Sequence, residues 1–276
     1  MMYDNWALCY DTLMEDYDYT ALLQFVQGRF CSSAAVRQVF ARKGAPLILD
    51  LGCGSGRLTT LLAQSGYDMI GLDLSEEMLE AAKLRAEQCG LAADRILWIC
   101  QDICKMDLFG TVAGMVCTTD VLNHLTTKKA LNQFFKNAYT FLDDGGVLIF
   151  DALTQRHFLE AAQARVFFED FEWGSCFWTC RYHTKSGICT YDISYFKCMS
   201  MSVQSENGIS SAAPAQHPEP CVYERFDDTV RERLWDTETL CAAAAEAGFA
   251  ACDVYGNLQL RGISKRDRRR YYVARK

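Results

Sequence analysis

The sequence has 276 residues, half of them hydrophobic, and a formal net charge of −7. No apolar run reaches the roughly 18 residues that span a bilayer, and the first residues lack a basic or apolar signal core, so we expect a cytoplasmic protein without a membrane partner. The acidic balance makes nucleic acid an improbable partner, because duplex binding depends on Lys and Arg.

Fourteen cysteines are scattered along the chain, and many lie in apolar runs, as Cys100 and Cys117 do. In a chain without a signal segment, this usage indicates reduced thiols in the core rather than disulfides. No C-x-x-C pair occurs, and the four histidines do not pair with cysteines at zinc-ligand spacing. We therefore expect no metal site.

Short apolar runs alternate with helix-period segments from residue 47 onward. The predicted strands cover residues 47–51, 68–72, 96–100, 112–118 and 147–150, with further strand-like runs near 249–256 and 270–274. The helix after the second strand starts at Ser75, with a predicted buried stripe of Leu79, Ala82, Ala86 and Cys89. The later helix from about 237 to 247 has Asp236 as N-cap and Gly248 as stop. This order predicts a Rossmann-like, doubly wound α/β fold with a mostly parallel seven-stranded sheet.

The period changes to strand-like alternation between Asp151 and Trp235, as in residues 177–182 and 188–196 on either side of a turn. We predict that residues 152–235 form a small inserted antiparallel β lid, and that residues 1–151 together with 236–276 form the core. The insertion is rich in aromatic residues, which suits a sheet over a pocket and equally a packing or dimer surface. Within it, residues 204–220 are predicted to be a flexible hairpin tip.

The most informative local pattern is the glycine turn Asp50-Leu51-Gly52-Cys53-Gly54-Ser55-Gly56, which follows the first strand. Glycine permits positive φ and has no Cβ, so this turn indicates a backbone that lies against a small ligand. A dinucleotide site normally reads G-x-G-x-x-G, and here Arg57 stands at the position of the third glycine. Nicotinamide or flavin binding is therefore the less favoured interpretation.

The segments LDLGCGSG and GLDLSEEML (residues 71–79) resemble the first two signature motifs of class I S-adenosylmethionine-dependent methyltransferases. The resemblance implies S-adenosyl-L-methionine as cofactor and S-adenosyl-L-homocysteine as product. It implies that the turn meets the methionine part, with Asp50 near the ammonium group. Asp73 would accept the ribose hydroxyls, and Asp102 the adenine amino group. The full expected set is Tyr10, Asp50, Gly52, Gly54, Gly56, Arg57, Asp73, Leu74, Met78, Asp102, Ile103 and Thr118.

Two further segments resemble parts of this family that lie near the transferred methyl group. Residues 2–19 are similar to the start of bacterial small methyltransferases with a Y-x-x-x-A-x-x-Y-D pattern, in which a tyrosine lies over the cofactor, and Tyr10 matches it. Residues 119–125, TDVLNHL, resemble the run that faces the transferred methyl group in that family. His124 is the candidate general base, and Tyr10 and Asp120 are further candidate catalytic residues.

The acceptor is left open. The family resemblance favours transfer to an N or O atom of a small molecule, but Val121, His124 and Val230 depart from the family pattern at positions expected to face it. Residues 261–276 hold eight basic side chains against Asp267, so either a solvated hairpin or an RNA contact of an RNA-modifying enzyme is possible. A binding protein that holds the cofactor without catalysis is another alternative, and the chain could be a monomer or a homodimer.

Overall fold

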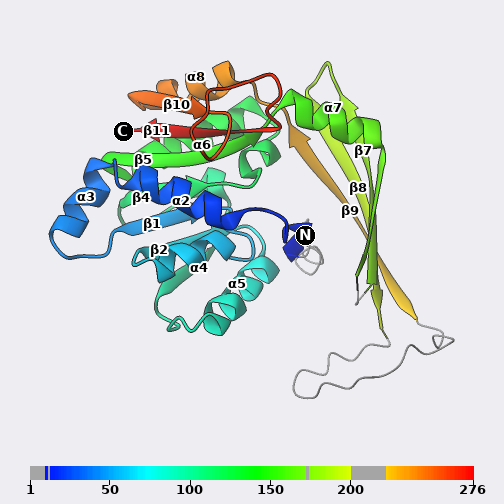
Figure 1. Ribbon diagram of the computed structural model, residues 1–276, viewed down its shortest axis with the longest axis horizontal. Helices are drawn as coiled ribbons and strands as arrows, with labels where there is room; N and C mark the ends of the chain where they lie inside the picture. The colour runs from blue at the N-terminus through cyan, green and yellow to red at the C-terminus, as the bar shows by residue number, and fades with distance from the viewer. Residues whose placement is uncertain (1–9, 12, 172–173, 200–221) are drawn as a thin grey trace.

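The computed structural model describes residues 10–11, 13–171, 174–199 and 222–276, and Figure 1 shows two sheets that stand beside one another. The helices are α2 (Tyr19–Phe30), α3 (Ala34–Ala41), α4 (Arg57–Gln64), α5 (Glu76–Gln88), α6 (Lys128–Phe141), α7 (Gln155–Ala164) and α8 (Thr237–Ala247). Two short 3-10 helices are η1 (Ile103–Lys105) and η2 (Val121–His124).

The larger sheet has seven strands in the order β10-β11-β5-β4-β1-β2-β3. Their bounds are β1 (Leu47–Leu51), β2 (Asp68–Asp73), β3 (Ile96–Cys100), β4 (Val112–Cys117), β5 (Leu142–Leu153), β10 (Ala251–Tyr255) and β11 (Arg269–Arg275). Strands β1 to β5 pair in parallel, whereas β11 is antiparallel to both of its neighbours. The predicted mostly parallel seven-stranded sheet is confirmed.

The predicted start of the fifth strand at residue 147 is wrong, because β5 begins at Leu142. Its pairing with β4 jumps from Val112↔Leu142 to Gly114↔Val147, so extra residues of β5 bulge out between these pairs. Gly145 has a φ of 75° within this bulge. The two glycines therefore bend a strand that has already begun rather than separating it from α6.

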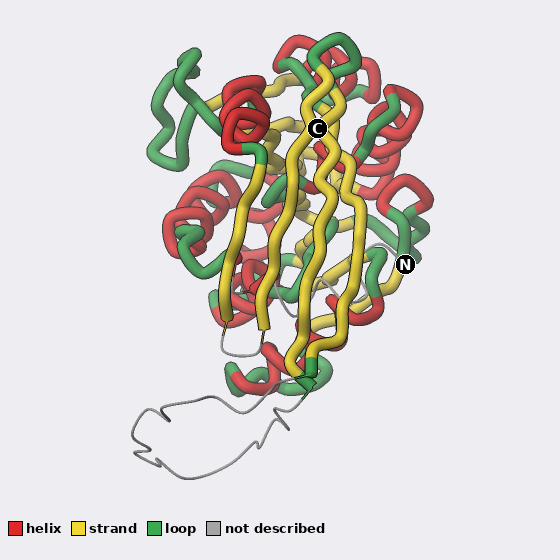
Figure 2. Tube along the Cα trace, turned by 90° about the vertical axis from the view of Figure 1, so that its right-hand side faces the viewer, coloured by secondary structure: helices red, strands yellow, loops and turns green. Residues whose placement is uncertain are grey.

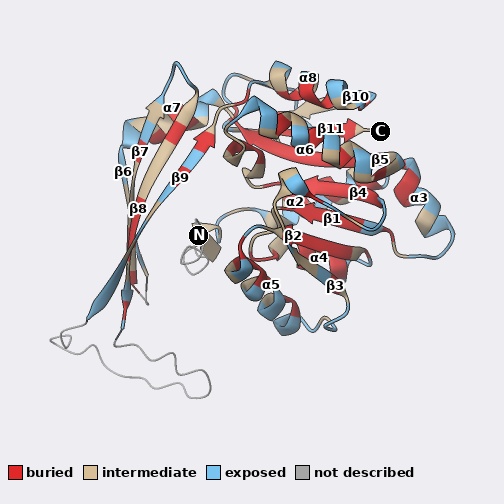
Figure 3. Cartoon of the chain, turned by 180° about the vertical axis from the view of Figure 1, so that it is seen from behind, coloured by how far each residue is buried: buried red, intermediate tan, exposed pale blue. Residues whose placement is uncertain are grey.

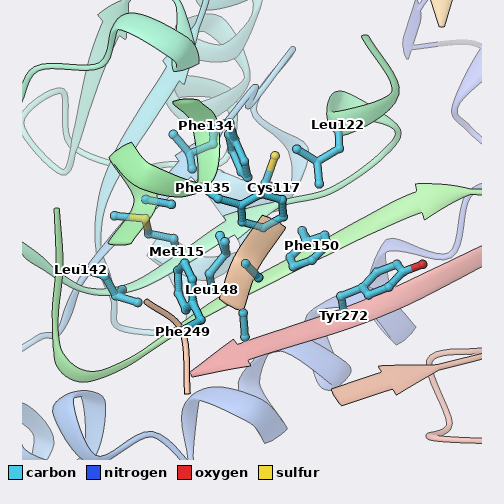
Figure 4. Packing of buried hydrophobic residues seen from close by; sticks show 14 of the residues in the cluster. Met115, Cys117, Leu122, Phe134, Phe135, Leu142, Leu148, Phe150, Phe249 and Tyr272 are labelled. Atoms are coloured by element: carbon cyan, nitrogen blue, oxygen red, sulfur yellow. The ribbon is translucent and has the colours of Figure 1, made fainter. Parts of the chain in front are cut away.

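Helices cover both faces of this sheet. Side chains of α2, α3 and α4 pack on one face, and those of α6 and α8 pack on the other. The strands between them are largely buried, as Figure 3 shows. In the cluster of Figure 4, Phe135 packs edge-on against Phe134, Phe150 and Phe249. Burying an aromatic side chain of this kind contributes about 1.5–3 kcal/mol.

Residues of the insertion form a four-stranded antiparallel sheet in the order β6-β7-β8-β9, visible face-on in Figure 2. Its strands are β6 (Val166–Phe171), β7 (Gly174–His183), β8 (Ile188–Cys198) and β9 (Tyr223–Arg233). The predicted antiparallel sheet is confirmed, and we call β6 to β9 the lid sheet. The predicted hairpin tip at 204–220 lies outside the described residues.

The end of β9 is fastened to the core through Asn123, which is fully buried in η2. Its side-chain amide donates to the carbonyl oxygen of Arg233 at 2.8 Å, and its Oδ1 accepts from the backbone N–H of Leu153 at 2.9 Å. The indole Nε1–H of Trp235 donates to the carbonyl of Leu125 at 3.0 Å. The lid sheet, β5 and η2 are thus joined at one point.

The prediction that the cysteines are core thiols is only partly right. Cys117 is buried in β4, but Cys89 and Cys100 are exposed, so the predicted stripe of α5 ends at Ala86. Cys89 is the C-cap residue of α5, and Cys100 ends β3, which is an edge strand. No disulfide joins the cysteines in the part of the chain that the structure describes. No helix among the same residues is both long and apolar enough to cross a bilayer.

Candidate functional site

The glycine turn connects β1 to α4 with a left-handed backbone. Gly52, Gly54 and Gly56 have φ values of 72°, 53° and 73°. A Cβ on Gly52 would lie 2.6 Å from Cγ2 of Val121, so no larger residue fits there without displacing that side chain. Gly56 caps α4, and a Cβ on it would collide with Ala82 at 2.8 Å. Gly52 therefore opens the cavity floor, while Gly56 allows close packing behind it.

An acid lies at or next to the end of each of two neighbouring strands, Asp50 in β1 and Asp73 in β2. Asp50 is 3 % exposed and accepts a hydrogen bond from Thr59 Oγ1 at 2.6 Å. Burial raises the pKa of Asp50 to about 7, although the bond from Thr59 acts in the opposite direction. Asp73 accepts from the backbone N–H of Gly54 at 2.8 Å and of Ser75 at 3.0 Å, and burial raises its pKa as well.

A cavity of about 220 Å³, which we call the strand-end cavity, lies over the turn and the ends of β1, β2 and β3. Its lining includes nine of the predicted site residues: Tyr10, Gly52, Gly54, Asp73, Leu74, Met78, Asp102, Ile103 and His124. A narrow extension of about 10 Å³ is lined by Tyr10, Asp50, Arg57 and Thr118, among others. Gly56 lines neither space, whereas Gln101, Thr119 and Leu125 are lining residues that the sequence did not single out.

Tyr10 lies over the turn, because a Cβ on Gly54 would sit 3.7 Å from Cε1 of the Tyr10 ring. Burial raises the pKa of the Tyr10 hydroxyl well above its ordinary value. The next residue, Asp11, accepts a hydrogen bond from Ser55 Oγ and forms an ion pair with Arg85 of α5. These contacts fasten the start of the described chain to the turn. Most of the predicted N-terminal motif, residues 2–9, lies outside the described residues.

A second space of about 380 Å³, which we call the lid chamber, separates the core from the lid sheet. Its lining residues are Tyr10, Leu13, Met14, Thr119, Asp120, His124, Leu153, His157, Glu169, Trp178, Tyr191, Ile193, Val230 and Glu232. Tyr10, Thr119 and His124 line both this chamber and the strand-end cavity. The two spaces therefore meet at these three residues.

The sequence missed Glu232, His157, Trp178 and Tyr191 as chamber residues. Val230 was predicted to face the acceptor, and Glu232 shares its face of β9 two residues later, so strand alternation was the available signal. Burial of Glu232 at 7 % exposure depends on how β9 packs against η2, which no local pattern reveals. His157 comes from α7, for which we predicted no helix.

His124 lies at the end of η2, where its Nε2 is 3.9 Å from Oε1 of Glu232. Burial lowers the pKa of His124, which favours the neutral imidazole at neutral pH. Burial, followed by the nearby Asp120 carboxylate, raises the pKa of Glu232 well above its ordinary value. The pair therefore contains a neutral nitrogen base beside a carboxyl group that resists ionisation.

Asp120 is engaged by the core. Thr119 and Asp120 have φ values of 60° and 75°, which is unusual for residues with side chains. Asp151 accepts both of their backbone N–H groups, at 2.8 and 3.0 Å, and Arg269 forms ion pairs with both carboxylates. These buried bonds hold the strained turn that carries Thr119 into both spaces.

The basic segment is also largely engaged. Within the described residues, six of its eight basic side chains form ion pairs: Arg261, Arg268, Arg269, Arg270, Arg275 and Lys276. The predicted solvated hairpin is therefore wrong in one respect, since Arg269 reaches the interior, with only 17 % of its side chain exposed.

Comparison with known proteins agrees with this architecture. Residues 48–146 match the family model described as a methyltransferase domain. A candidate methyltransferase of Geobacillus sp. (strain WCH70) is 26 % identical over 276 residues, and the match covers all of both chains.

Two solved structures are similar over almost the whole chain. An S-adenosylmethionine-dependent methyltransferase from Clostridium acetobutylicum ATCC 824 has a TM-score of 0.72 at 22 % identity, covering 98 % of this chain and 97 % of that one. The sugar N-methyltransferase KedS8 from Streptoalloteichus sp ATCC 53650 has a TM-score of 0.65 at 21 % identity, covering 97 % and 92 %. The chain therefore contains a segment, residues 48–146, that matches a methyltransferase domain, within a fold that it shares with S-adenosylmethionine-dependent methyltransferases.

Proposed function

We propose that the protein transfers a methyl group from S-adenosyl-L-methionine to an N or O atom of a small molecule held in the lid chamber. The observation that carries this proposal is the meeting of the strand-end cavity and the lid chamber at Tyr10, Thr119 and His124. A cofactor in the first space and an acceptor in the second would face one another only there. Residues 152–235 would then serve as the acceptor-binding part of the molecule, and the rest of the chain as its cofactor-binding core.

The chemistry of the strand-end cavity fits the cofactor. The bare backbone at Gly52 leaves room that a side chain would fill, and Asp50 is a buried carboxyl group suited to the ammonium of the methionine part. Asp73 would bind the ribose hydroxyls, as a carboxylate that already faces the turn. Asp102 and Ile103 would hold the adenine ring. When bound, the cofactor supplies a methyl group on a positively charged sulfur.

The work left to the protein is alignment and exclusion of water, because a thioether leaves without protonation. Holding the two partners in one geometry can lower the barrier by about 7–11 kcal/mol. The engaged carboxylate of Asp120 suits it to positioning the Thr119 turn rather than to taking a proton. His124 is the candidate base, because its neutral nitrogen lies at the junction. Tyr10 would cover the cofactor and orient the acceptor.

The alternatives have less support. An RNA-modifying enzyme needs cationic side chains free to meet phosphates, and most of those in residues 261–276 pair with carboxylates of the protein. A protein that only stores the cofactor has no need for the lid chamber of about 380 Å³. The chamber is therefore the feature that favours catalysis on a small molecule.

Calorimetry with S-adenosyl-L-homocysteine tests the first half of the proposal, with micromolar or tighter binding expected. Turnover tests the second half, as release of S-adenosyl-L-homocysteine from S-adenosyl-L-methionine in the presence of a panel of small amines and alcohols. With an accepted substrate, His124→Ala should lower turnover by about 10²–10⁴-fold, the usual contribution of a general base, and leave cofactor affinity within about twofold. Unchanged turnover would remove His124 from the reaction, and failure to bind the nucleoside would refute the proposed function.

A further inference from the structure

The lid chamber has a one-sided charge. Three of the described residues that line the chamber carry carboxyl groups: Asp120, Glu169 and Glu232. The described lining residues include no lysine and no arginine. Asp120 is ion-paired with Arg269, and Glu169 is exposed on the edge strand β6. Glu232 differs from both because it is buried inside the chamber wall. An anionic acceptor would meet repulsion here, and a cation would be attracted.

One carboxyl oxygen of Glu232, Oε2, could accept a further hydrogen bond. Oε2 is buried and has no hydrogen-bond partner among the described residues. Leaving such an atom unsatisfied costs about 1–3 kcal/mol, and more when the group is charged. The other oxygen, Oε1, lies 3.9 Å from His124 Nε2. A ligand that donates a hydrogen bond to Oε2 would remove this cost.

The surroundings of Glu232 do not neutralise it, although a hydrogen bond from the Tyr191 hydroxyl to its carboxyl group acts to lower the pKa. Its neighbouring charged or titratable groups are Asp120 and His124 at η2, Cys180 of β7, Cys189 and Tyr191 of β8, and Arg269 of β11. Of these, Arg269 is the permanent cation, and it is already bound by Asp120 and Asp151. Because Arg269 is occupied, the carboxyl group of Glu232 resists ionisation until a cation enters the chamber beside it.

Aromatic rings complete this wall of the chamber. Trp178 and Tyr191 line it, and the Trp178 indole is stacked on Phe167 with ring centroids 5.2 Å apart, which fixes its plane. An ammonium group near such faces gains about 0.5–2 kcal/mol. A buried carboxyl group next to aromatic faces is a combination suited to a cationic amine.

We propose that the acceptor is an amine that enters the lid chamber as an ammonium ion and is bound there by Glu232. This inference rests on the proposed function and narrows its acceptor from an N or O atom to nitrogen. The ammonium, paired with the carboxylate of Glu232, first gives one proton to the neutral imidazole of His124, whose Nε2 lies 3.9 Å from Glu232 Oε1. The freed nitrogen lone pair then forms a bond to the methyl carbon, and the electron pair of the broken C–S bond stays on sulfur. The methylated nitrogen becomes the new cation.

Small ring compounds of similar size and different charge can test this assignment. The probes are cyclohexylamine, cyclohexanol and cyclohexanecarboxylate, titrated into protein saturated with S-adenosyl-L-homocysteine and followed by tryptophan fluorescence and by NMR of the probe. A charge-assisted hydrogen bond of about 1.5–3 kcal/mol predicts that the amine binds at least about tenfold more tightly than the alcohol. The carboxylate should bind most weakly of the three.

Glu232→Gln should remove this preference and leave cyclohexanol binding within about twofold, since the side chain keeps its size and loses its charge. The matched control is Glu224→Gln, which makes the same change at an exposed position of the same strand and should retain the preference. Because burial raises the pKa of Glu232, binding of the amine should also strengthen as pH rises, and Glu232→Gln should abolish that dependence.

Equal binding of amine and alcohol, or a preference that survives in Glu232→Gln, would overturn the assignment of an amine to Glu232. Tighter binding of the carboxylate would do the same. Retained binding of S-adenosyl-L-homocysteine in those experiments would leave the proposed methyl transfer intact, whereas loss of that binding in the wild-type protein would refute the proposed function itself. Thermal unfolding of each variant shows whether the fold is preserved.

Discussion

The strand-end cavity and the lid chamber meet at three residues, but they are built in different ways. The cavity is formed where neighbouring parallel strands end, so backbone geometry and short acids at strand ends define it. The chamber is formed where lid strands pack on core residues more than a hundred positions away in the sequence, as Glu232 packs on His124. One half of the site is therefore fixed by a local motif and the other by long-range packing.

The difference between the core and the lid sheet can first be tested by measuring the stability of variants in each. Phe135 is fully buried in the core and contacts three other aromatic rings, so Phe135→Ala should lower the free energy of unfolding by about 3–5 kcal/mol. Trp178 in the lid sheet is only partly buried, and Trp178→Ala should cost less, about 1 kcal/mol. Urea unfolding measures both values. Equal losses would mean that the lid sheet contributes as much to stability as the core does.

The buried acid of the cavity predicts a pH dependence. Burial raises the pKa of Asp50 to about 7, so folding favours its protonated form. The stabilisation from this proton is complete below the unfolded pKa of about 3.9 and is lost as pH rises through about 7, a change on the order of a few kcal/mol. The advantage of Asp50→Asn over wild type should therefore grow between pH 4 and pH 8.

Unfolding measured at several pH values checks this prediction. Asp68→Asn is the control, because Asp68 starts the next strand with its side chain half exposed. A parallel pH dependence of wild type and Asp50→Asn would contradict the proposed protonation of Asp50.

Cofactor affinity should depend on the cavity alone. Asp73→Ala should weaken S-adenosyl-L-homocysteine binding about a hundredfold, because two charge-assisted hydrogen bonds to the ribose would be lost. Asp68→Ala, at the opposite end of β2, should leave the affinity unchanged, and so should Trp178→Ala in the lid sheet. Calorimetry gives all three values. A large effect of Trp178→Ala would show that the two halves are energetically coupled.

We expect the smallest effect from substitutions outside both the strand-end cavity and the lid chamber. Lys265 and Arg266 are exposed, and neither forms an ion pair with a described residue. Replacing both with alanine should change the free energy of unfolding by less than about 0.5 kcal/mol. Filter binding of RNA at low and at physiological salt should be unaffected. A salt-dependent loss of RNA retention in this variant would revive the RNA-modifying alternative.

The features that could be predicted from the sequence are those that depend on local patterns. The alternation of elements predicted the seven-stranded sheet, and the glycine turn with Asp73 and Asp102 predicted most of one cavity, since neighbouring strand ends must meet at one edge of the sheet. The pattern also predicted an antiparallel lid sheet. The partner of Glu232 could not be predicted in this way, because its contact with His124 depends on the packing of β9 on η2.

The wrong predictions also concern features that depend on long-range packing. Cys89 and Cys100 follow apolar patterns but lie at a helix end and on an edge strand, where the sheet no longer covers them. Arg269 belongs to a basic run that reads as solvated, yet its place on β11 brings it beside Asp151 of β5. Which member of such a run turns inward is decided by sheet register.

The hydrogen bonds of Asn123 have a consequence for how a ligand could enter the lid chamber. Swinging β9 away from η2 would break the bonds of Asn123 and Trp235 together, and each such bond contributes about 0.5–1.5 kcal/mol. We therefore expect the edge between β9 and η2 to stay closed. Accordingly, we expect an acceptor of the proposed reaction to enter the lid chamber elsewhere than between β9 and η2.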